Sequence, residues 1–218
     1  MSKTSKSRRS KHEPRPLSPK VGRALQLAFE LHRRQLRKGS GVPYLAHLLG
    51  VASTAMRYGA TESEAIAALL HDAIEDQGGK KTRARLRRLF GARVTGIVDE
   101  CTDTDLVPKP PWRARKEAYI RHLASASKSA LLVSAADKLD NARDLLADHK
   151  AVGDALWERF AGGKAGTLWY YRSLITAFRR AAAPEALVNE LDLVVTQIER
   201  RVAGSQPSTK RIAATTRP

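Results

Sequence analysis

Residues 68–76 read ALLHDAIED, and this stretch decides how the rest of the chain is interpreted. The run leading into it begins at Thr61, where Thr61-x-x-Glu64 forms a capping box that predicts the start of a helix. Successive helical residues are about 100° apart, so four ionisable residues fall in one sector of about 140°. These residues are His71, Asp72, Glu75 and Asp76. Their leucine, alanine and isoleucine neighbours indicate that this end of the helix is packed.

Three carboxylates within one helical turn are unfavourable in two ways. They repel one another by a few tenths of a kcal/mol per pair, even when they are exposed. They also lie near the C-terminus of the predicted helix, where the dipole disfavours negative charge. A bound cation would turn the repulsion into attraction, so the pattern indicates a cation-binding site.

Apolar periodicity and Gly/Pro breaks divide the remaining chain into further helices. The predicted helices are 18–38, 44–58, 61–76, 82–90, 92–101, 113–126, 128–147, 151–160, 166–182 and 184–202. Residues 102–112 read TDTDLVPKPPW and predict a loop. The C-terminal end of helix 18–38 carries the cations Arg33, Arg34, Arg37 and Lys38, which suit the helix dipole there. Strand-like alternation and hairpin signals are absent, so the sequence predicts an all-α fold.

Composition predicts one globular domain with basic tails. The chain has 218 residues, 42% hydrophobic and 28% charged, which fits a single soluble domain. Of the net charge of +17, residues 1–20 contribute +6 and residues 200–218 contribute +5. Both ends are rich in Ser, Thr and Pro, so we expect disordered tails at 1–17 and 204–218 around a domain at 18–203. Such tails predict solubility or weak nucleic-acid contact.

The sequence favours a reducing compartment and no membrane association. No apolar run approaches the roughly 20 residues that a membrane-spanning helix needs, and the N-terminus lacks the apolar segment of a secretory signal. Cys101 is the single cysteine, so an intrachain disulfide is excluded. We therefore expect a cytoplasmic protein whose oligomeric state the sequence leaves open.

Two further stretches carry polar residues among apolar ones. Residues 129–146 read SALLVSAADKLDNARDLL, in which Asp137, Asn141 and Asp144 recur at i, i+4 and i+7 along one helix face. Asp137 follows a nearly continuous apolar run, so its carboxylate needs a cation or strong hydrogen bonds. His47 lies in the apolar segment YLAHLL, residues 44–49.

Each of these features has a simpler explanation when taken alone. His47 could be a hydrogen-bonded core histidine, Asp137 with Asn141 a buried hydrogen-bond network, and Glu75 with Asp76 a solvated helix end. Together they supply two imidazoles and two carboxylates for one divalent metal. Two further carboxylates lie one turn beyond, as a hydrolytic site would need.

At these residues the chain resembles the HD superfamily. Within it, the chain is most similar to the hydrolase domain of the Rel/Spo homologues and to the small, stand-alone alarmone hydrolases. The resemblance covers about residues 30–180 and runs in order. Its blocks are HRRQLRKG, PYLAHLLGVA, ALLHDAIED, LFGARVTGIVDECTD and ADKLDNARDL.

The resemblance implies an HD-domain helical bundle with one Mn²⁺ that hydrolyses the 3′-diphosphate of guanosine tetra- or pentaphosphate. The implied metal ligands are His47, His71, Asp72 and Asp137. The implied catalytic acidic pair is Glu75 and Asp76, and the implied substrate contacts are Arg37, Lys38, Lys109 and Asn141. Mixed His/Asp ligation also suits Fe²⁺ and Zn²⁺. Asp140 departs from the aromatic residue or histidine common in the family. We expect no synthetase domain.

Other functions remain open from the sequence. The same ligand set could serve another nucleotide, such as an adenosine alarmone or a dinucleotide 2′-phosphate. Aromatic residues that could stack on a base are Tyr44, Trp112, Trp169, Tyr170 and Tyr171. A different class of function is a nucleic-acid-associated protein with a non-catalytic HD site, which the basic tails favour. A cyclic-dinucleotide phosphodiesterase lacks support, because His12, His32, His122 and His149 do not mark a second metal site.

Overall fold

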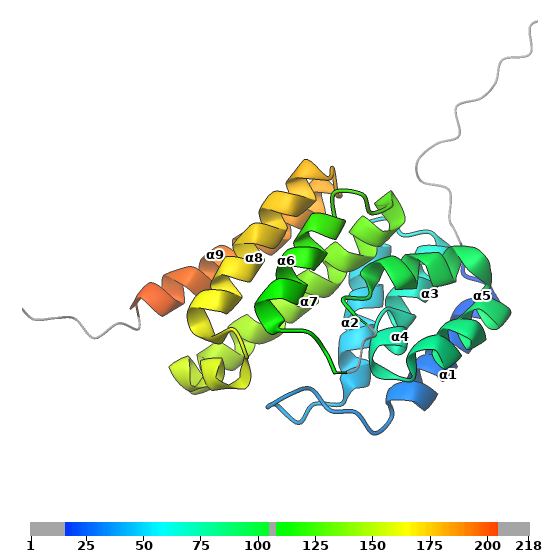
Figure 1. The fold of residues 1–218 in the computed structure, drawn as a ribbon, viewed down its shortest axis with the longest axis horizontal. Coiled ribbons are helices and arrows are strands. Elements are labelled where there is room, and N and C mark those ends of the chain that lie inside the picture. Colours follow the sequence, from blue (N-terminus) through cyan, green and yellow to red (C-terminus); the bar gives the residue numbers. More distant parts are fainter. Residues whose placement is uncertain (1–15, 105–107, 205–218) are drawn as a thin grey trace, which may run out of the picture.

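The computed structural model describes residues 16–104 and 108–204, and these residues form a helical bundle without a named strand (Figure 1). This confirms the predicted all-α class. The helices are α1 (Pro19–His32), α2 (Tyr44–Arg57), α3 (Glu62–Leu70), α4 (Ala73–Asp76), α5 (Gly79–Cys101), α6 (Trp112–His122), α7 (Lys128–Val152), the 3₁₀ helix η1 (Gly153–Arg159), α8 (Gly163–Arg180) and α9 (Glu185–Gly204).

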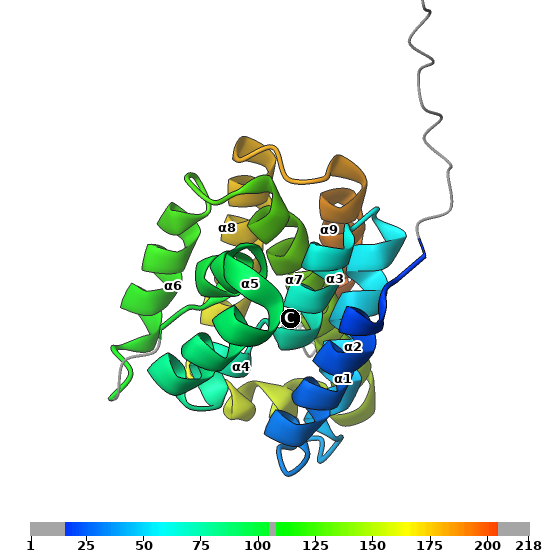
Figure 2. The ribbon, with the colours of Figure 1, turned by 90° about the vertical axis from the view of Figure 1, so that its right-hand side faces the viewer.

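Helix α7 is the centre of the bundle. It contacts α2, α3, α5, η1 and α9, and it separates the half built from α1–α5 from the half built from α6, α8 and α9 (Figures 1 and 2). Ser127 caps its start by accepting a hydrogen bond from the backbone N–H of Ala130. The apolar run Leu131–Ala136 is buried, so Asp137, the polar residue that follows it, lies at the centre of the molecule.

The first helix is shorter than predicted. Helix α1 ends at His32, and the predicted continuation to residue 38 is wrong. The chain folds back instead: the N–H of Tyr44 donates to Gln35 O at 2.9 Å, and the N–H of Arg37 donates to Val42 O at 2.7 Å. Leu36 is exposed, so no apolar face favours a further helical turn. Arg37 and Lys38 therefore lie in a loop and do not face the C-terminal dipole of α1.

The predicted continuous helix 61–76 is also wrong, and the break falls at the functional residues. The capping box at Thr61 and Glu64 is confirmed. Helix α3 then ends at Leu70, His71 and Asp72 form a turn, and the single-turn helix α4 follows. Asp72 adopts φ −95° and ψ 0°, which distorts the regular helix. The turn separates His71 and Asp72 from Glu75 and Asp76, so the four residues do not share one helix face.

A glycine marks a second break that the sequence did predict. Gly91 has φ 86° and ψ 176°, which interrupts α5 between the predicted helices 82–90 and 92–101. Glycine reaches this region of positive φ without the steric cost that a side chain brings. The first of these helices begins earlier than predicted, at Gly79, after Gly78 in a left-handed conformation.

The predicted basic tails, 1–17 and 204–218, lie outside the described residues except for 16–17 and Gly204. Among the described helices, none is long and apolar enough to cross a membrane.

Candidate metal centre and active site

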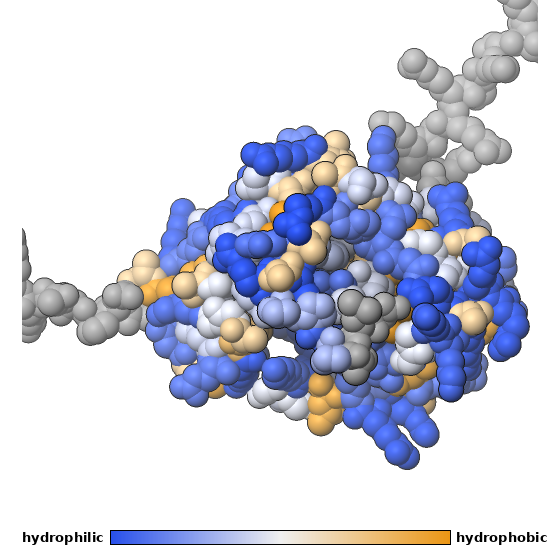
Figure 3. Space-filling model, in the orientation of Figure 1, coloured by the Kyte–Doolittle hydropathy of each residue, from blue (hydrophilic) through white to orange (hydrophobic). Residues whose placement is uncertain are grey.

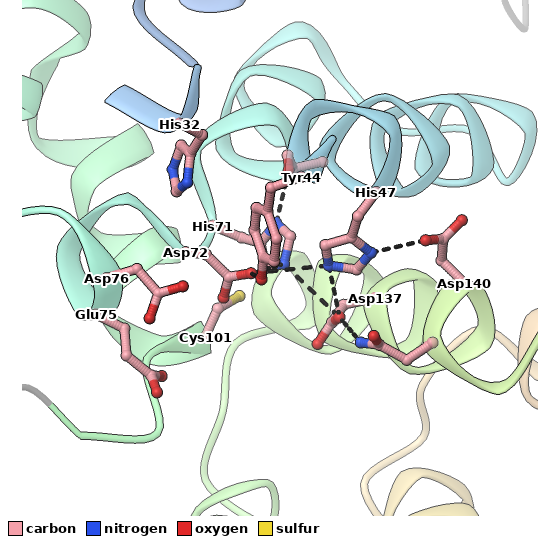
Figure 4. Close-up of polar contacts among 12 residues, drawn as sticks. His32, Tyr44, His47, His71, Asp72, Glu75, Asp76, Cys101, Asp137 and Asp140 are labelled. Atoms are coloured by element: carbon pink, nitrogen blue, oxygen red, sulfur yellow. Dashed lines mark hydrogen bonds and ion pairs between the residues drawn. The ribbon is translucent and has the colours of Figure 1, made fainter. Parts of the chain in front are cut away.

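Three side chains from three parts of the chain converge at the centre of the bundle. His47 comes from α2, His71 from the turn after α3, and Asp137 from α7 (Figure 4). One ligand atom from each lies within 4.8 Å of the other two, and all three residues are buried. The Nε2 atom of His47 lies 3.3 Å from Asp137 Oδ1, and that of His71 lies 3.7 Å from the same oxygen. The structure therefore brings together residues that are up to 90 positions apart in the sequence.

Asp72 supplies a fourth polar atom to this group, a second carboxylate oxygen. Its Oδ2 lies 3.0 Å from His71 Nε2 and 3.7 Å from His47 Nε2. The hydroxyl of Tyr44 donates a hydrogen bond to the same oxygen at 2.5 Å. The turn at 71–72 allows two adjacent residues to face one point, which a regular helix would prevent because neighbouring side chains are about 100° apart.

The electrostatics of the cluster are dominated by its carboxylates. Burial opposes charge on His71, but the carboxylates of Asp72 and Asp137 outweigh this effect and raise its pKa well above the ordinary value. Burial likewise opposes charge on Asp72, but the charge of His71 outweighs it and lowers the pKa of Asp72. The carboxylates of the cluster thus favour positive charge at its centre. A divalent cation would supply this charge.

Asp137 is held from both sides by its neighbours on α7. Lys138 Nζ lies 2.5 Å from Asp137 Oδ2, and the side-chain amide of Asn141 donates a hydrogen bond to Oδ1. The second contact confirms the predicted i, i+4 pairing along this face. Sequence reasoning did not assign Lys138 a role, although its position directly after a buried aspartate was an available signal.

The two histidines are anchored through their other ring nitrogens. His71 Nδ1 lies 2.9 Å from the backbone oxygen of Ala68. His47 Nδ1 lies 2.7 Å from Asp140 Oδ2. Both rings thus present Nε2 to the cluster, and Asp140 joins the centre although the sequence had shown it only as a departure from the family.

These residues fit a divalent metal ion. His71 Nε2 is fully buried and has no hydrogen-bond partner, although it lies 3.0 Å from a carboxylate oxygen. Such an unpartnered buried nitrogen is costly unless another group, such as a cation, satisfies it. Two imidazole nitrogens and two carboxylate oxygens are a donor set suited to first-row divalent metals.

The predicted acidic pair lies to one side of the cluster, beyond Asp72 (Figure 4). Glu75 accepts hydrogen bonds from Lys109 Nζ at 2.7 Å and from the backbone N–H of Asp103 at 3.1 Å. Asp76 accepts one from Gln35 at 2.8 Å. Lys109 therefore contacts the acidic pair. It does not line the cavity that opens beside His47.

A cavity of about 600 Å³ opens beside His47. Arg37, Lys38 and Asn141, the substrate contacts that the family resemblance implies, all line it. Arg37 donates to Asn141 Oδ1 at 3.0 Å and pairs with Asp144 at 2.6 Å, so the polar stripe of α7 holds this arginine. In Figure 3 the molecule is hollowed below its middle, on a surface that is mostly hydrophilic.

Aromatic side chains form much of the cavity wall. Tyr44, Trp112, Tyr170 and Tyr171 line it, whereas Trp169 lines a separate groove near α6. Lys116 also lines the cavity, with its Nζ 5.0 Å from the ring centre of Tyr170. A cavity of this size, with aromatic walls and a few charged groups, is typical of a small-ligand site.

The family model described as HD domain matches residues 24–163. The chain belongs to the HD-domain family, which confirms the resemblance inferred from the motifs. Similar proteins include the guanosine-3′,5′-bis(diphosphate) 3′-pyrophosphohydrolases MESH1 of Xenopus tropicalis and Homo sapiens, which are 40% and 39% identical over 125 residues. The matched segment covers 56% of this chain and 67% of each relative.

Solved structures share the fold. One, described as a metazoan ortholog of SpoT that hydrolyses ppGpp and plays a role in starvation responses, superposes with a TM-score of 0.71 at 30% identity. The superposition covers 85% of this chain and 98% of the chain of that solved structure. A second solved structure, lmo0812 from Listeria monocytogenes, superposes with a TM-score of 0.62 at 26% identity. The superposition covers 71% of this chain and 99% of the chain of lmo0812.

Proposed function

We propose that this chain is a metal-dependent hydrolase that removes the 3′-diphosphate of guanosine tetra- or pentaphosphate. The observation that carries the proposal is the position of the four-ligand cluster: His47 belongs both to it and to the wall of the neighbouring cavity. The similarity to the MESH1 enzymes, which are named as hydrolases of this nucleotide, supports the choice of substrate.

In this proposal His47, His71, Asp72 and Asp137 hold the metal, and Mn²⁺ is the preferred ion. Fe²⁺ and Zn²⁺ remain compatible with the donor set. When bound, a divalent cation acidifies water and withdraws charge from phosphate oxygens. Tyr44 and Lys138 hold the oxygens of Asp72 and Asp137 that they contact, so both carboxylates enter the site in fixed orientations.

Glu75 and Asp76 are the proposed acid–base pair. Water attacks the phosphorus next to the ribose, and the bond between that phosphorus and the ribose 3′-oxygen breaks. Glu75 and Asp76 accept the proton of the attacking water and return one to the 3′-oxygen. The products are the 3′-hydroxyl nucleotide and pyrophosphate. Lys109 pairs with Glu75, and we expect a substrate phosphate to compete for Lys109 and free this carboxylate.

Arg37, Lys38 and Asn141 are the proposed contacts for the nucleotide. The two cations provide fixed charge for phosphate, and Asn141 offers an amide to a ribose hydroxyl. Tyr44, Trp112 and Tyr170 give the base flat apolar surfaces on which to stack.

The test uses the full chain with Mn²⁺ and guanosine tetraphosphate. We expect release of pyrophosphate and loss of that release in His71→Ala, whereas Arg172→Lys, on the far side of α8, retains it. A panel with adenosine alarmones and a dinucleotide 2′-phosphate decides the base. If the folded, Mn²⁺-loaded wild type releases no product from guanosine tetraphosphate, the proposed substrate is wrong.

The wider setting of the enzyme is also a proposal. We assign it to the cytoplasm, since its single cysteine requires no oxidising compartment. Residues 18–203 would form the catalytic unit. The basic tails would make weak contact with nucleic acid. Cys101 is not a nucleophile in this scheme, because burial raises its pKa to about 11.

A further inference from the structure

Asp140 contacts a proposed metal ligand without facing the metal position itself. It lies on α7 three residues after Asp137, so the two carboxylates occupy the same helix face, about 5–6 Å apart at Cβ. The imidazole of His47 lies between them, with Nε2 3.3 Å from Asp137 Oδ1 and Nδ1 2.7 Å from Asp140 Oδ2. In Figure 4 Asp140 lies on the side of His47 opposite the acidic pair.

We propose that Asp140 is a positioning residue for the metal, holding the Nδ1–H of His47 so that its Nε2 faces the cluster. A carboxylate only accepts hydrogen bonds, so its partner Nδ1 must carry the proton. The neutral ring then offers the lone pair of Nε2 to a cation. This inference rests on the metal-binding half of the proposed function and does not depend on the substrate.

The packing around His47 leaves this task to Asp140. Tyr44 and His71 contact the faces and edges of the ring, with centroids 5.4 Å and 5.2 Å away. Such ring contacts restrict the plane of the imidazole, but they do not distinguish one nitrogen from the other. A half-turn of the ring about its Cβ–Cγ bond would exchange Nδ1 with Cδ2 and Nε2 with Cε1, and the bond to Asp140 opposes this turn at the Nδ1 edge.

The two histidines differ in the strength of this support. The anchor of His71 is a neutral backbone carbonyl, that of Ala68, whereas the anchor of His47 is a charged carboxylate. A carboxylate makes the opposite nitrogen a better electron donor, and loss of such an outer partner typically costs about 10–100-fold in metal affinity. His47 should therefore depend more on its outer partner than His71 does.

Gly50 provides the space that Asp140 occupies. It lies in α2, one turn after His47, and the three atoms that a Cβ at Gly50 would meet all belong to Asp140. That Cβ would lie 2.9 Å from Asp140 Cγ and would collide with Oδ1. An alanine at this position would displace the carboxylate of Asp140.

The experiment measures Mn²⁺ affinity directly, from the paramagnetic resonance signal of free Mn²⁺ titrated with protein. We expect Asp140→Ala to weaken binding by about 10–100-fold. Asp140→Asn keeps an acceptor oxygen and loses the charge, so its affinity should fall between that of Asp140→Ala and wild type. Gly50→Ala should also weaken binding, although alanine favours helix more than glycine does.

A double-mutant cycle separates positioning from general damage. If Gly50→Ala acts only through Asp140, the double variant Gly50→Ala/Asp140→Ala should match Asp140→Ala within about twofold. Glu190→Gln is the matched control, because Glu190 also links α2 to α7 through Tyr58 and Arg143 but contacts no residue of the cluster. It should bind Mn²⁺ within about twofold of wild type.

A second measurement reports the ring itself. In protein loaded with diamagnetic Zn²⁺, the Nδ1–H proton of His47 should give a sharp imidazole signal that broadens or disappears in Asp140→Ala and persists in Glu190→Gln. Should Asp140→Ala fail to fold, Asp140→Asn and Gly50→Ala still decide the question. Wild-type Mn²⁺ affinity in both Asp140 variants would overturn the proposal, as would a Gly50→Ala effect that persists without Asp140. If the wild type binds Mn²⁺ but hydrolyses no guanosine tetraphosphate, the proposed substrate fails while the role of Asp140 is still decided by the Mn²⁺ affinities.

Discussion

Glu75 is the residue whose surroundings best separate binding from chemistry. Its two carboxylate oxygens accept from Lys109 and from the backbone of Asp103, and neither contacts the histidines. It can therefore lose its charge without disturbing the ligand set. Asp72, three residues earlier, cannot lose its charge in this way, because its Oδ2 faces both imidazoles of the ligand set.

We predict that Glu75→Gln keeps the metal and loses the reaction. An amide cannot accept the proton of the attacking water, and general acid–base groups typically contribute 10²–10⁴-fold to the rate. The value of kcat should fall by about that factor while Mn²⁺ affinity stays near wild type. Steady-state kinetics together with Mn²⁺ titration check this, and Asp72→Asn, which should lose the metal, serves as the contrast. A Glu75→Gln enzyme with wild-type kcat would remove Glu75 from the mechanism.

Asp154 in η1 allows a pH test away from the metal. Its carboxylate accepts from Lys164 at 2.8 Å and Trp157 at 3.0 Å and lies 3.2 Å from His149, and these contacts lower its pKa to about 2. The unfolded value is about 3.9. The folded state favours the ionised form, so its stabilisation is present above about pH 4 and is lost as the pH falls towards 2.

The expected result is a pH-dependent gap between wild type and Asp154→Asn. At pH 5 the wild type should have the larger free energy of unfolding, and the gap should narrow between pH 4 and pH 2. Urea unfolding at a series of pH values measures it. A gap that stays constant or widens on acidification would contradict the assigned contacts.

At the scale of elements, the sequence predicted the helices better than it predicted their ends. The apolar run before Asp137 required a buried helix, and α7 is that helix. The end of α1 at His32 was missed because the pairing of Gln35 with Tyr44 joins residues on two sides of a loop. Local periodicity contains no information about such a contact.

The same reason explains which site residues could be predicted. His71 and Asp72 are adjacent, and Asp137 follows an apolar run, so local sequence pointed to them. The support of His47 by Asp140 spans 93 positions and depends on how α2 packs against α7. For Lys109, the family resemblance implied a phosphate contact, whereas in the structure its ammonium pairs with Glu75.

Helices α8 and α9 should contribute stability without contributing ligands. Phe178 of α8 is fully buried, and replacing such a residue by alanine costs about 3–5 kcal/mol. For a domain of this size, Phe178→Ala should lower Tm by roughly 6–20 °C. Hydrolysis well below the transition should remain, because the cluster is built by α2, α7 and the turn between α3 and α4.

Calorimetry and a rate measurement at low temperature check this expectation. The control is Leu193→Ala on α9, where the side chain is 64% exposed and the change should stay within about 0.5 kcal/mol. If Phe178→Ala lost the metal while still folded, the C-terminal helices would have a direct role in the metal cluster.

At the scale of the whole molecule, charge is distributed unevenly. The ends of the chain carry +11 of the net +17, and the cavity holds cations of its own, such as Arg37. Attraction of a polyanionic substrate therefore has two sources that can be separated. Only the cations of the cavity act at contact distance, where salt screens their charge least.

We predict that deleting 1–17 and 204–218 leaves kcat for guanosine tetraphosphate unchanged. The same deletion should weaken the salt-sensitive affinity for single-stranded RNA, because the deleted segments carry +5 and +3 of the net charge of +17. Paired assays of hydrolysis and RNA binding at two salt concentrations test both parts. If hydrolysis disappeared from a folded, metal-loaded truncation, the function would depend on the tails.

The contact between Lys138 and Asp137 has a consequence for which ions the centre accepts. Asp72, Asp137 and Asp140 surround the two histidines, and Lys138 compensates one of their three negative charges. With neutral imidazoles, two negative charges remain uncompensated in the interior, where unbalanced charge is costly. A divalent ion brings this group to electroneutrality, whereas sodium or potassium leaves it one charge short. We therefore expect the centre to favour divalent over monovalent cations.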